Sequence, residues 1–249
     1  NGPSELLIAL SDDDFTFDLK GKYNELLSSS QSLTPTQQSY LKFLEHNINT
    51  HYSSQPKYLI EANEIINTYG RGHHHDHRFF RSQISANLAL FKTGVLQGML
   101  KTFTAALKSL GLMGWMSHGN MYGWMYNGLP FPYDDDIDFQ LPLKHMHIFA
   151  EHFNQSVLLQ DPRFGYGRYF VDFGNIGGRT HGNGNNNIHG RSIDMDIGLY
   201  IDITGLSLNS ELISDKFYNE LADFLNEKIT VPNRKYQVQH NKIYHEKLF

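Results

Sequence analysis

Four aspartates fall within five positions of the stretch GLPFPYDDDIDFQLP, residues 128–142. They are Asp134, Asp135, Asp136 and Asp138, and apolar or aromatic residues flank them on both sides. Like charges this close destabilise one another, and burial would raise the pKa of each carboxyl unless a positive partner compensates. Alternate residues of a strand share a face, so Asp134, Asp136 and Asp138 would point one way and Asp135 the other.

A divalent cation is the positive partner that this pattern favours. Asp136 and Asp138 would lie roughly 6–7 Å apart along a strand, which two carboxylates can close around one ion. Carboxylate oxygens suit Mg²⁺, Mn²⁺ or Ca²⁺ rather than Zn²⁺. An EF-hand calcium loop is excluded, because Phe139 and His145 stand where it needs glycine and glutamate. A solvated surface turn is the alternative interpretation, and the apolar flanks argue against it.

A second acidic group occurs in IDMDIGLYIDI, residues 193–203, which contains Asp194, Asp196 and Asp202. Carboxylates in isoleucine-rich strands are poor core residues unless they are paired. We expect one of them to complete the cation site. Asp202 is favoured, because the following ITGL is interpreted as a turn where a sheet opens to solvent, and Asp196 is the next candidate.

Helices alternate with a few strands along the chain, which predicts an α/β or α+β fold. The most regular helix is expected over 95–112, where apolar residues recur at helical spacing and Gly111 can end it. The other expected helices cover 39–50, 61–70, 143–160 and 211–229. A strand, a tight turn and a short helix are expected over 114–128, and further strands over 136–141, 169–178 and 192–206, the last as one strand or a pair.

Composition narrows the class of protein. The chain has 249 residues, of which 40% are hydrophobic and 13% aromatic, enough for a substantial core. Its formal net charge of −5 speaks against nucleic-acid binding. The absence of cysteine excludes disulfides and thiolate chemistry. The opening NGPSELLIAL resembles neither a start nor a signal peptide, so the chain is interpreted as a piece of a longer protein.

The segment 117–142, SHGNMYGWMYNGLPFPYDDDIDFQLP, resembles the signature of the LicD and fukutin-related family. LYIDITGL, residues 199–206, is similar to the second acidic strand of that family. GHHHDHRFF at 72–80 and DIGLYIDITGLS at 196–207 resemble its fungal branch, the yeast proteins required for mannosylphosphate transfer to cell-wall glycans. The resemblance covers roughly residues 70–207.

This resemblance implies a nucleotidyltransferase-like mixed sheet flanked by helices, over 95–249, after an N-terminal helical extension over 1–94. It implies transfer of mannose 1-phosphate from GDP-mannose to a hydroxyl of a mannose-rich glycan, with Mn²⁺ or Mg²⁺ as cofactor and GMP as leaving group. It also implies a Golgi-lumen protein whose membrane anchor lies outside this chain.

The family's metal ligands map onto the two acidic stretches. The resemblance implies that Asp136 and Asp138 are the paired ligands, that Asp134 assists them and that Asp202 is the third carboxylate. Asp196 stays a candidate ligand from its place in the second acidic group alone.

The donor phosphates are assigned to the turn His118-Gly119-Asn120, where nucleotidyltransferases usually have Gly-Ser or Gly-Gly. Amides around Gly119 and the following helix N-terminus would hold phosphate, and Asn120 would donate a hydrogen bond. Asp202 or His118 would be the base. Three residues bracket an Asn/Gly-rich loop, 181–191, that is expected to close over the donor: Arg179, His189 and Arg191.

Two rival functions remain open. One is a glycosyltransferase whose D-I-D motif binds a nucleotide-sugar, transfers the sugar alone and releases a diphosphate. The other is a non-catalytic regulator of a true mannosylphosphate transferase.

Two further features, a histidine run and a pair of tryptophans, can each be interpreted as functional or as structural. His73, His75 and His77 alternate and could bind zinc, but a hydrogen-bonded loop that packs the following phenylalanines is favoured. Trp115 and Trp124 could stack on a sugar or base, but core packing is favoured.

Overall fold

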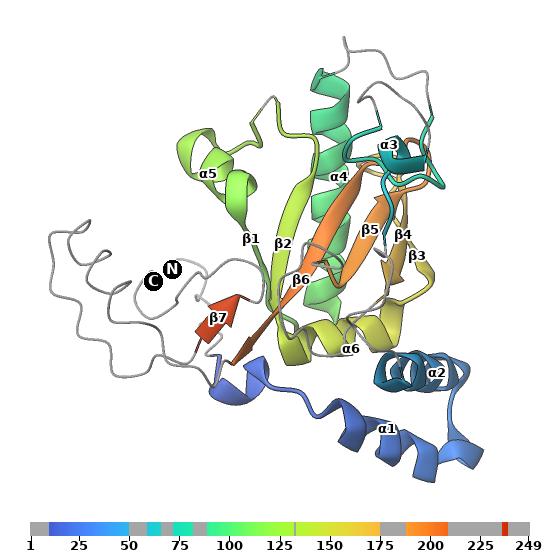
Figure 1. The fold of residues 1–249 in the computed structure, drawn as a ribbon. Coiled ribbons are helices and arrows are strands. Elements are labelled where there is room, and N and C mark those ends of the chain that lie inside the picture. Colours follow the sequence, from blue (N-terminus) through green and yellow to red (C-terminus); the bar gives the residue numbers. More distant parts are fainter. Residues whose placement is uncertain are drawn as a thin grey trace, which may run out of the picture.

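A mixed sheet forms the centre of the computed structural model, which describes residues 10–49, 59–65, 72–81, 89–131, 133–174, 188–208 and 236–238 (Figure 1). Six strands lie in the order β1-β2-β6-β5-β4-β3, and β7 pairs with β6. Their bounds are β1 Trp115–Met116, β2 Ile137–Pro142, β3 Ser156–Leu159, β4 Arg168–Phe173, β5 Gly190–Asp194, β6 Tyr200–Leu208 and β7 Tyr236–Val238.

Strands β3 to β6 are consecutive antiparallel neighbours, whereas β2 and β6 pair in parallel. The parallel pair sets Asp138 directly opposite Asp202. With helices packed on the sheet, this architecture confirms the predicted α+β class.

The helices are α1 Leu19–Ser28, α2 Pro35–Asn49, α3 Ala62–Ile65, α4 Ala89–Ser109, α5 His118–Asn127 and α6 Leu143–Phe153, with short 3₁₀ turns η1 Asp12–Phe15 and η2 Ser30–Ser32. Helix α4 runs along one face of the sheet, and α5 lies beside β1 and β2 at its edge (Figure 1). Among the described residues, no helix is both long and apolar enough to cross a bilayer.

Helix α4 forms because its apolar residues recur at three- and four-residue intervals and bury one stripe. Leu96, Met99, Phe103 and Leu107 are buried along this stripe. The Phe103 ring lies 5.1 Å from the ring of Phe139 in β2, so the stripe packs directly on the sheet. The helix ends before Gly111, whose φ of +67° favours glycine.

The strand faces alternate as β periodicity requires. In β2, Ile137, Phe139 and Leu141 belong to the hydrophobic core, so Asp136 and Asp138 project from the opposite face. In β6, Ile201 and Ile203 are core residues, so Asp202 projects from the same face as the aspartates of β2. The carboxylates therefore gather on the sheet face that α4 does not cover.

Helix α6 is shorter than the expected helix over 143–160. It ends at Phe153, Gln155 has a φ of +60°, and β3 begins at Ser156. The sequence expectation overran because Val157 and Leu158 pair with β4, a long-range contact that helix periodicity does not reveal.

The N-terminal helices share the core with the sheet. Leu26, Tyr40 and Leu44 of α1 and α2 belong to the same hydrophobic cluster as the strand residues. The Tyr40 hydroxyl lies 2.9 Å from Nδ1 of His147 on α6, in a buried hydrogen bond. Residues of both expected domains, 1–94 and 95–249, thus build one core.

The isoleucine-rich stretch 192–206 forms two strands rather than one. The turn between β5 and β6 is fixed by Asp194, whose Oδ1 accepts hydrogen bonds from the amides of Asp196 and Ile197. Gly198 in this turn has a φ of +88°. A Cβ there would lie 3.0 Å from the Phe80 amide nitrogen, so segment 72–81 packs closely against the turn.

The expected helix over 211–229 and most of the loop 181–191 lie outside the described residues, as do residues 66–70 of the expected helix over 61–70 and residues 175–178 of the expected strand over 169–178.

Candidate functional site

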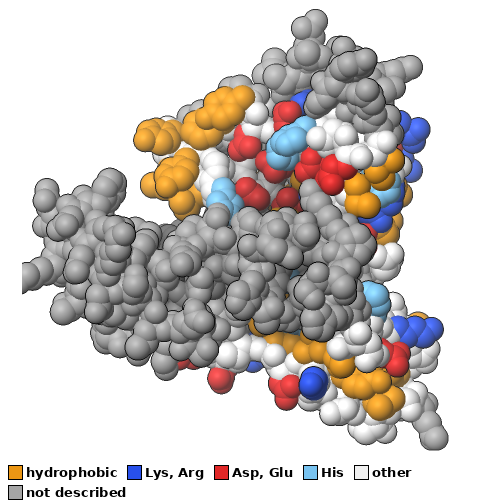
Figure 2. All heavy atoms as spheres, viewed as in Figure 1, with side chains coloured by type: hydrophobic (Ala, Val, Ile, Leu, Met, Phe, Trp, Pro, Cys, Tyr) orange, Lys and Arg blue, Asp and Glu red, His pale blue; other side chains and the backbone are white. Residues whose placement is uncertain are grey.

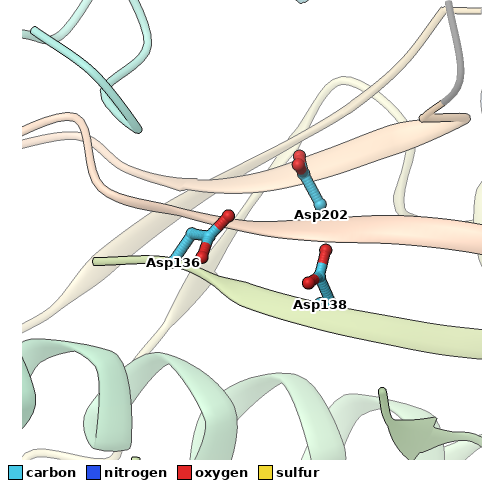
Figure 3. Close-up of side chains that lie close together, drawn as sticks. All are labelled: Asp136, Asp138 and Asp202. Atoms are coloured by element: carbon cyan, nitrogen blue, oxygen red, sulfur yellow. The ribbon is translucent and has the colours of Figure 1, made fainter. Parts of the chain in front are cut away.

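Three carboxylates meet where β2 and β6 run side by side (Figure 3). Asp136 immediately precedes β2, Asp138 is its second residue, and Asp202 is the third residue of β6. One carboxylate oxygen of each lies within 4.8 Å of the others, and no other such group of three occurs in the described part of the chain. We call these residues the aspartate triad.

The electrostatics of the triad match a cation site. Burial, together with the charges of Asp136 and Asp202, raises the pKa of Asp138 to about 7. Burial also raises the pKa of Asp202, against the opposing effect of Arg191. Of the three carboxyls only Asp136 has a lowered pKa, because the hydrogen bond and charge of His74 outweigh its burial. Charged Asp138 and Asp202 are therefore unfavourable here without a further positive group. A hard divalent cation fits the all-oxygen donor set and would supply that charge.

Asp134 lies at the edge of the triad. Burial and the neighbouring Asp136 charge raise its pKa to about 6. Its Oδ2 accepts a hydrogen bond of 2.8 Å from Nδ2 of Asn120, so part of its acceptor capacity is used by the protein. Asp135, expected on the opposite face, pairs with Lys92 of α4 at 2.8 Å.

Asn120 holds the aspartate segment in place. Its Nδ2 also donates to the carbonyl of Asp136 at 3.0 Å, and its Oδ1 accepts the amide hydrogen of Asp138 at 2.6 Å. The side chain is buried. This corrects the expected role of Asn120: these contacts commit both of its polar atoms to the aspartate segment, so it positions aspartates rather than donor phosphate.

The turn into α5 places two expected phosphate-site residues beside the triad. His118 begins α5 with a φ of +51°, and a Cβ on Gly119 would lie 3.2 Å from Oδ2 of Asp134. Burial lowers the pKa of His118, although the nearby Asp136 charge opposes this effect. The lowered pKa keeps the His118 imidazole neutral at pH 7. The Ser117 hydroxyl at the N-cap is buried and has no hydrogen-bond partner.

Arg191 contacts the triad from the neighbouring strand β5 and does not lie in a loop that closes over the triad. It lies opposite Asp202 in the β5–β6 pair, and its Nε donates to Asp202 Oδ1 at 2.6 Å. A second guanidinium nitrogen donates to the carbonyl of Leu59 at 2.8 Å. The guanidinium also lies 3.6 Å over the ring of Tyr200. The expectation that Arg191 reaches the donor is therefore corrected, because its position in β5 buries it.

His189 and Arg179 complete the expected loop set. His189 is buried, and its Nδ1 accepts the amide hydrogen of Gly205 at 3.0 Å. It therefore braces β6 rather than facing a donor, a second correction. Arg179 lies outside the described residues.

Asp202 and Asp196 are placed differently from the sequence interpretation. The ITGL that follows Asp202 continues β6 instead of forming a turn, and Asp202 is buried. Asp196 is exposed in the β5–β6 turn, where it pairs with Arg168. The structure therefore corrects the metal set by leaving Asp196 outside the triad, since the turn directs it away from the β2–β6 pair.

Sequence reasoning missed three residues close to the triad: Glu61, His74 and Tyr200. Nδ1 of His74 lies 3.1 Å from Oδ2 of Asp136, and the Tyr200 hydroxyl donates to Glu61 at 2.9 Å. Although burial disfavours its charged form, the hydrogen bond and charge of Asp136 raise the pKa of His74. The run HHHDH was the available signal, but the alternation argument selected His73, His75 and His77 and passed over His74.

Those three histidines do not converge on a zinc site. Nδ1 of His75 contacts the carbonyl of His73 at 2.8 Å, and Nδ1 of His77 contacts the carbonyl of Ile60 at 3.1 Å. Phe79 packs on Phe170 of β4, with 6.1 Å between ring centroids. The favoured interpretation, a hydrogen-bonded loop that packs phenylalanine, agrees with these contacts.

The fold and the triad define the class: an α+β domain with three converging carboxylates on adjacent parallel strands. Two curated proteins of Saccharomyces cerevisiae are similar to the chain. Mannosyltransferase regulator 4 is 40% identical over 228 residues, which are 89% of this chain and 19% of that protein. Mannosyltransferase regulator 14 is 43% identical over 211 residues, 82% of this chain and 22% of that protein.

The chain thus spans about a fifth of the length of the curated relatives it matches. Their names agree with the predicted yeast branch concerned with mannose transfer. No family model matches the chain, and its assignment to the LicD and fukutin-related family stays a prediction.

Proposed function

We propose that this chain is a cation-dependent domain that transfers mannose 1-phosphate from GDP-mannose to a hydroxyl of a mannose-containing glycan. The observation that carries the proposal is the aspartate triad, in which three carboxylates converge from β2 and β6. The mannose substrate is supported by the names of the relatives, which both concern mannosyltransferases.

In this proposal the triad residues Asp136, Asp138 and Asp202 hold Mn²⁺ or Mg²⁺. When bound, such an ion supplies charge neutralisation at the donor pyrophosphate. The N-terminal amides of α5 around Gly119 bind the donor phosphates, because a helix N-terminus favours anions. The acceptor hydroxyl forms a bond to the phosphorus nearest the mannose, the bond to the GMP phosphate breaks, and the hydroxyl proton passes to the neutral imidazole of His118.

The second candidate function is regulation of a mannosyltransferase without turnover. The observation that favours it is specific: both relatives are named regulators, and neither is named a transferase. In this case the triad would bind a cation, with or without the nucleotide-sugar, to hold the conformation that the regulated enzyme requires.

One experiment separates the candidates. The intact protein is incubated with GDP-mannose, Mn²⁺ and a mannose oligosaccharide, and the released nucleotide is identified. Transfer of mannose 1-phosphate yields GMP, and this release is lost in Asp136→Ala and Asp138→Ala but kept in Asp196→Ala, which lies outside the triad. GDP release would indicate transfer of the sugar alone. A folded protein that binds Mn²⁺ and releases no nucleotide would favour the regulator.

A further inference from the structure

An exposed aromatic surface lies beside the aspartate triad. It is formed by α5 and the segment that follows it: Tyr122, Trp124, Met125, Tyr126, Leu129 and Tyr133. Exposed fractions reach 81% for Tyr126, 78% for Tyr133 and 60% for Trp124, so the expectation that Trp124 packs in the core is wrong. In Figure 2 hydrophobic side chains over α5 stand next to the acidic and histidine side chains of the site. We call these six residues the α5 surface.

The α5 surface is built into the same segment that carries the site. Helix α5 begins at His118 and Gly119, and Tyr133 directly precedes Asp134. Gly123 lets the helix lie close to the chain that returns to β2, since a Cβ there would lie 2.8 Å from the carbonyl oxygen of Leu129. The Tyr133 ring stacks on Phe131 with 5.2 Å between centroids, which fixes its position in this segment.

The surface carries no charge. From Ser109 to Tyr133 the sequence contains no Asp, Glu, Lys or Arg. All four of its exposed rings are Tyr or Trp, which combine an apolar face with a hydrogen-bonding group. An uncharged ligand with both apolar C–H faces and hydroxyl groups matches this chemistry.

We propose that the α5 surface binds the acceptor glycan, a neutral oligosaccharide, and directs one of its hydroxyls to the triad. This inference rests on the proposed function for the identity of the sugar, mannose. Stacking of pyranose faces on the rings accounts for both the aromatic composition and the lack of charge. Tyr133 of the α5 surface directly precedes Asp134, so a glycan bound on this surface would lie close to the site.

The shape of the surface favours a glycan over the donor nucleotide. Small-molecule and cofactor sites are concave and bury most of their ligand. The α5 side chains instead project into solvent, with Met125 exposed by 70% and Tyr122 by 54%. An extended oligosaccharide can lie along such an open surface, whereas a nucleotide would stay largely solvated on it.

The test measures binding of α-linked mannotetraose to the intact protein by isothermal titration calorimetry, without nucleotide or metal. Tyr122 and Tyr126 are four residues apart and share a helix face, so the double variant Tyr122→Ala/Tyr126→Ala removes two adjacent rings. We expect it to weaken binding about tenfold or more. The matched control is Tyr166→Ala, an equally drastic change at a residue exposed by 87% between β3 and β4, at the other edge of the sheet.

The outcomes are distinct from those of the nucleotide-release experiment. Binding that is lost in the double variant, and kept in Tyr166→Ala, supports the glycan surface whether or not the protein turns over GDP-mannose. Equal loss in Tyr166→Ala, or no mannotetraose binding by the wild-type protein, overturns the proposal. A double variant that binds mannotetraose normally but has lost self-association or binding to lipid vesicles also overturns it, because the surface then serves another occupant.

Discussion

At the scale of single residues, Asp138 is expected to lower the stability of the metal-free protein. Its pKa is raised from 3.8 to about 7 by burial and by its acidic neighbours. A carboxyl with a raised pKa in the folded state contributes stability below the unfolded pKa, and this contribution is lost as the pH rises toward 7. Asp138→Asn should therefore raise the free energy of unfolding at pH 8 by up to about 4 kcal/mol.

Urea denaturation in EDTA at pH 8 and pH 4.5 checks this expectation. The gain from Asp138→Asn should shrink strongly at pH 4.5, where the wild-type carboxyl is largely protonated. In a parallel series without EDTA, added Mn²⁺ should stabilise the wild type and leave Asp138→Asn unchanged, because binding to the folded state alone raises stability. Asp196→Asn, at an exposed position, is the control. A variant as stable as wild type at pH 8 would show that the triad carries no uncompensated charge.

Arg191 should stabilise the fold, because its charge compensates the buried carboxylate of Asp202. It is buried with Asp202, and removing one partner of a buried ion pair leaves the other uncompensated, at a cost of about 3–5 kcal/mol. Arg191→Met should destabilise by that order, and Arg191→Met/Asp202→Asn should recover much of the loss. Arg191→Lys should recover little, since an ammonium cannot reach Asp202 and the Leu59 carbonyl as the guanidinium fork does. Additive effects in a double-mutant cycle by chemical denaturation would contradict this pairing.

At the scale of elements, Asn120 joins α5 to the start of β2. Its side chain makes three hydrogen bonds, to Asp134, Asp136 and Asp138. Asn120→Ala should weaken Mn²⁺ binding more than tenfold, because the triad loses its alignment while the sheet itself stays paired. Calorimetric titration of Mn²⁺ measures this, and circular dichroism checks the fold. Met125→Ala, at a residue of the same helix exposed by 70%, is the control. Unchanged affinity in Asn120→Ala would mean that the backbone alone positions Asp136 and Asp138.

The elements also show what could be predicted from the sequence. Periodicity located α4 and the strand with Asp136 and Asp138 on one face, because both patterns depend on residues a few positions apart. It could not give the parallel register that sets Asp138 opposite Asp202, nor the end of α6, because those depend on pairing with distant strands. His74 was missed for the same reason: its contact with Asp136 joins residues 62 positions apart, and no local pattern reveals it.

At the scale of the whole molecule, the N-terminal part completes both the core and the site. Leu59 and Glu61 lie against Arg191, His74 contacts Asp136, and Tyr40 bonds to His147. A truncated protein that begins at residue 95 loses these partners. It leaves the Arg191 guanidinium without its backbone acceptor and the core without Leu26 and Leu44. We therefore expect residues 95–249 alone to lack a cooperative thermal transition and to bind Mn²⁺ at least tenfold more weakly.

His74→Ala tests the part of this effect that belongs to the site. His74 is half-buried, so its removal should leave the thermal transition in place, yet Asp136 loses the partner that aligns its carboxylate. Mn²⁺ affinity should fall several-fold in His74→Ala and stay unchanged in His73→Ala, whose exposed side chain lies next to it. If the truncated protein unfolds cooperatively and binds Mn²⁺ as tightly as the whole chain, residues 95–249 are an independent domain and segment 59–81 only covers its surface. If the truncated protein neither unfolds cooperatively nor binds Mn²⁺ tightly, while His74→Ala folds and binds Mn²⁺ weakly, the N-terminal part contributes to both the core and the cation site.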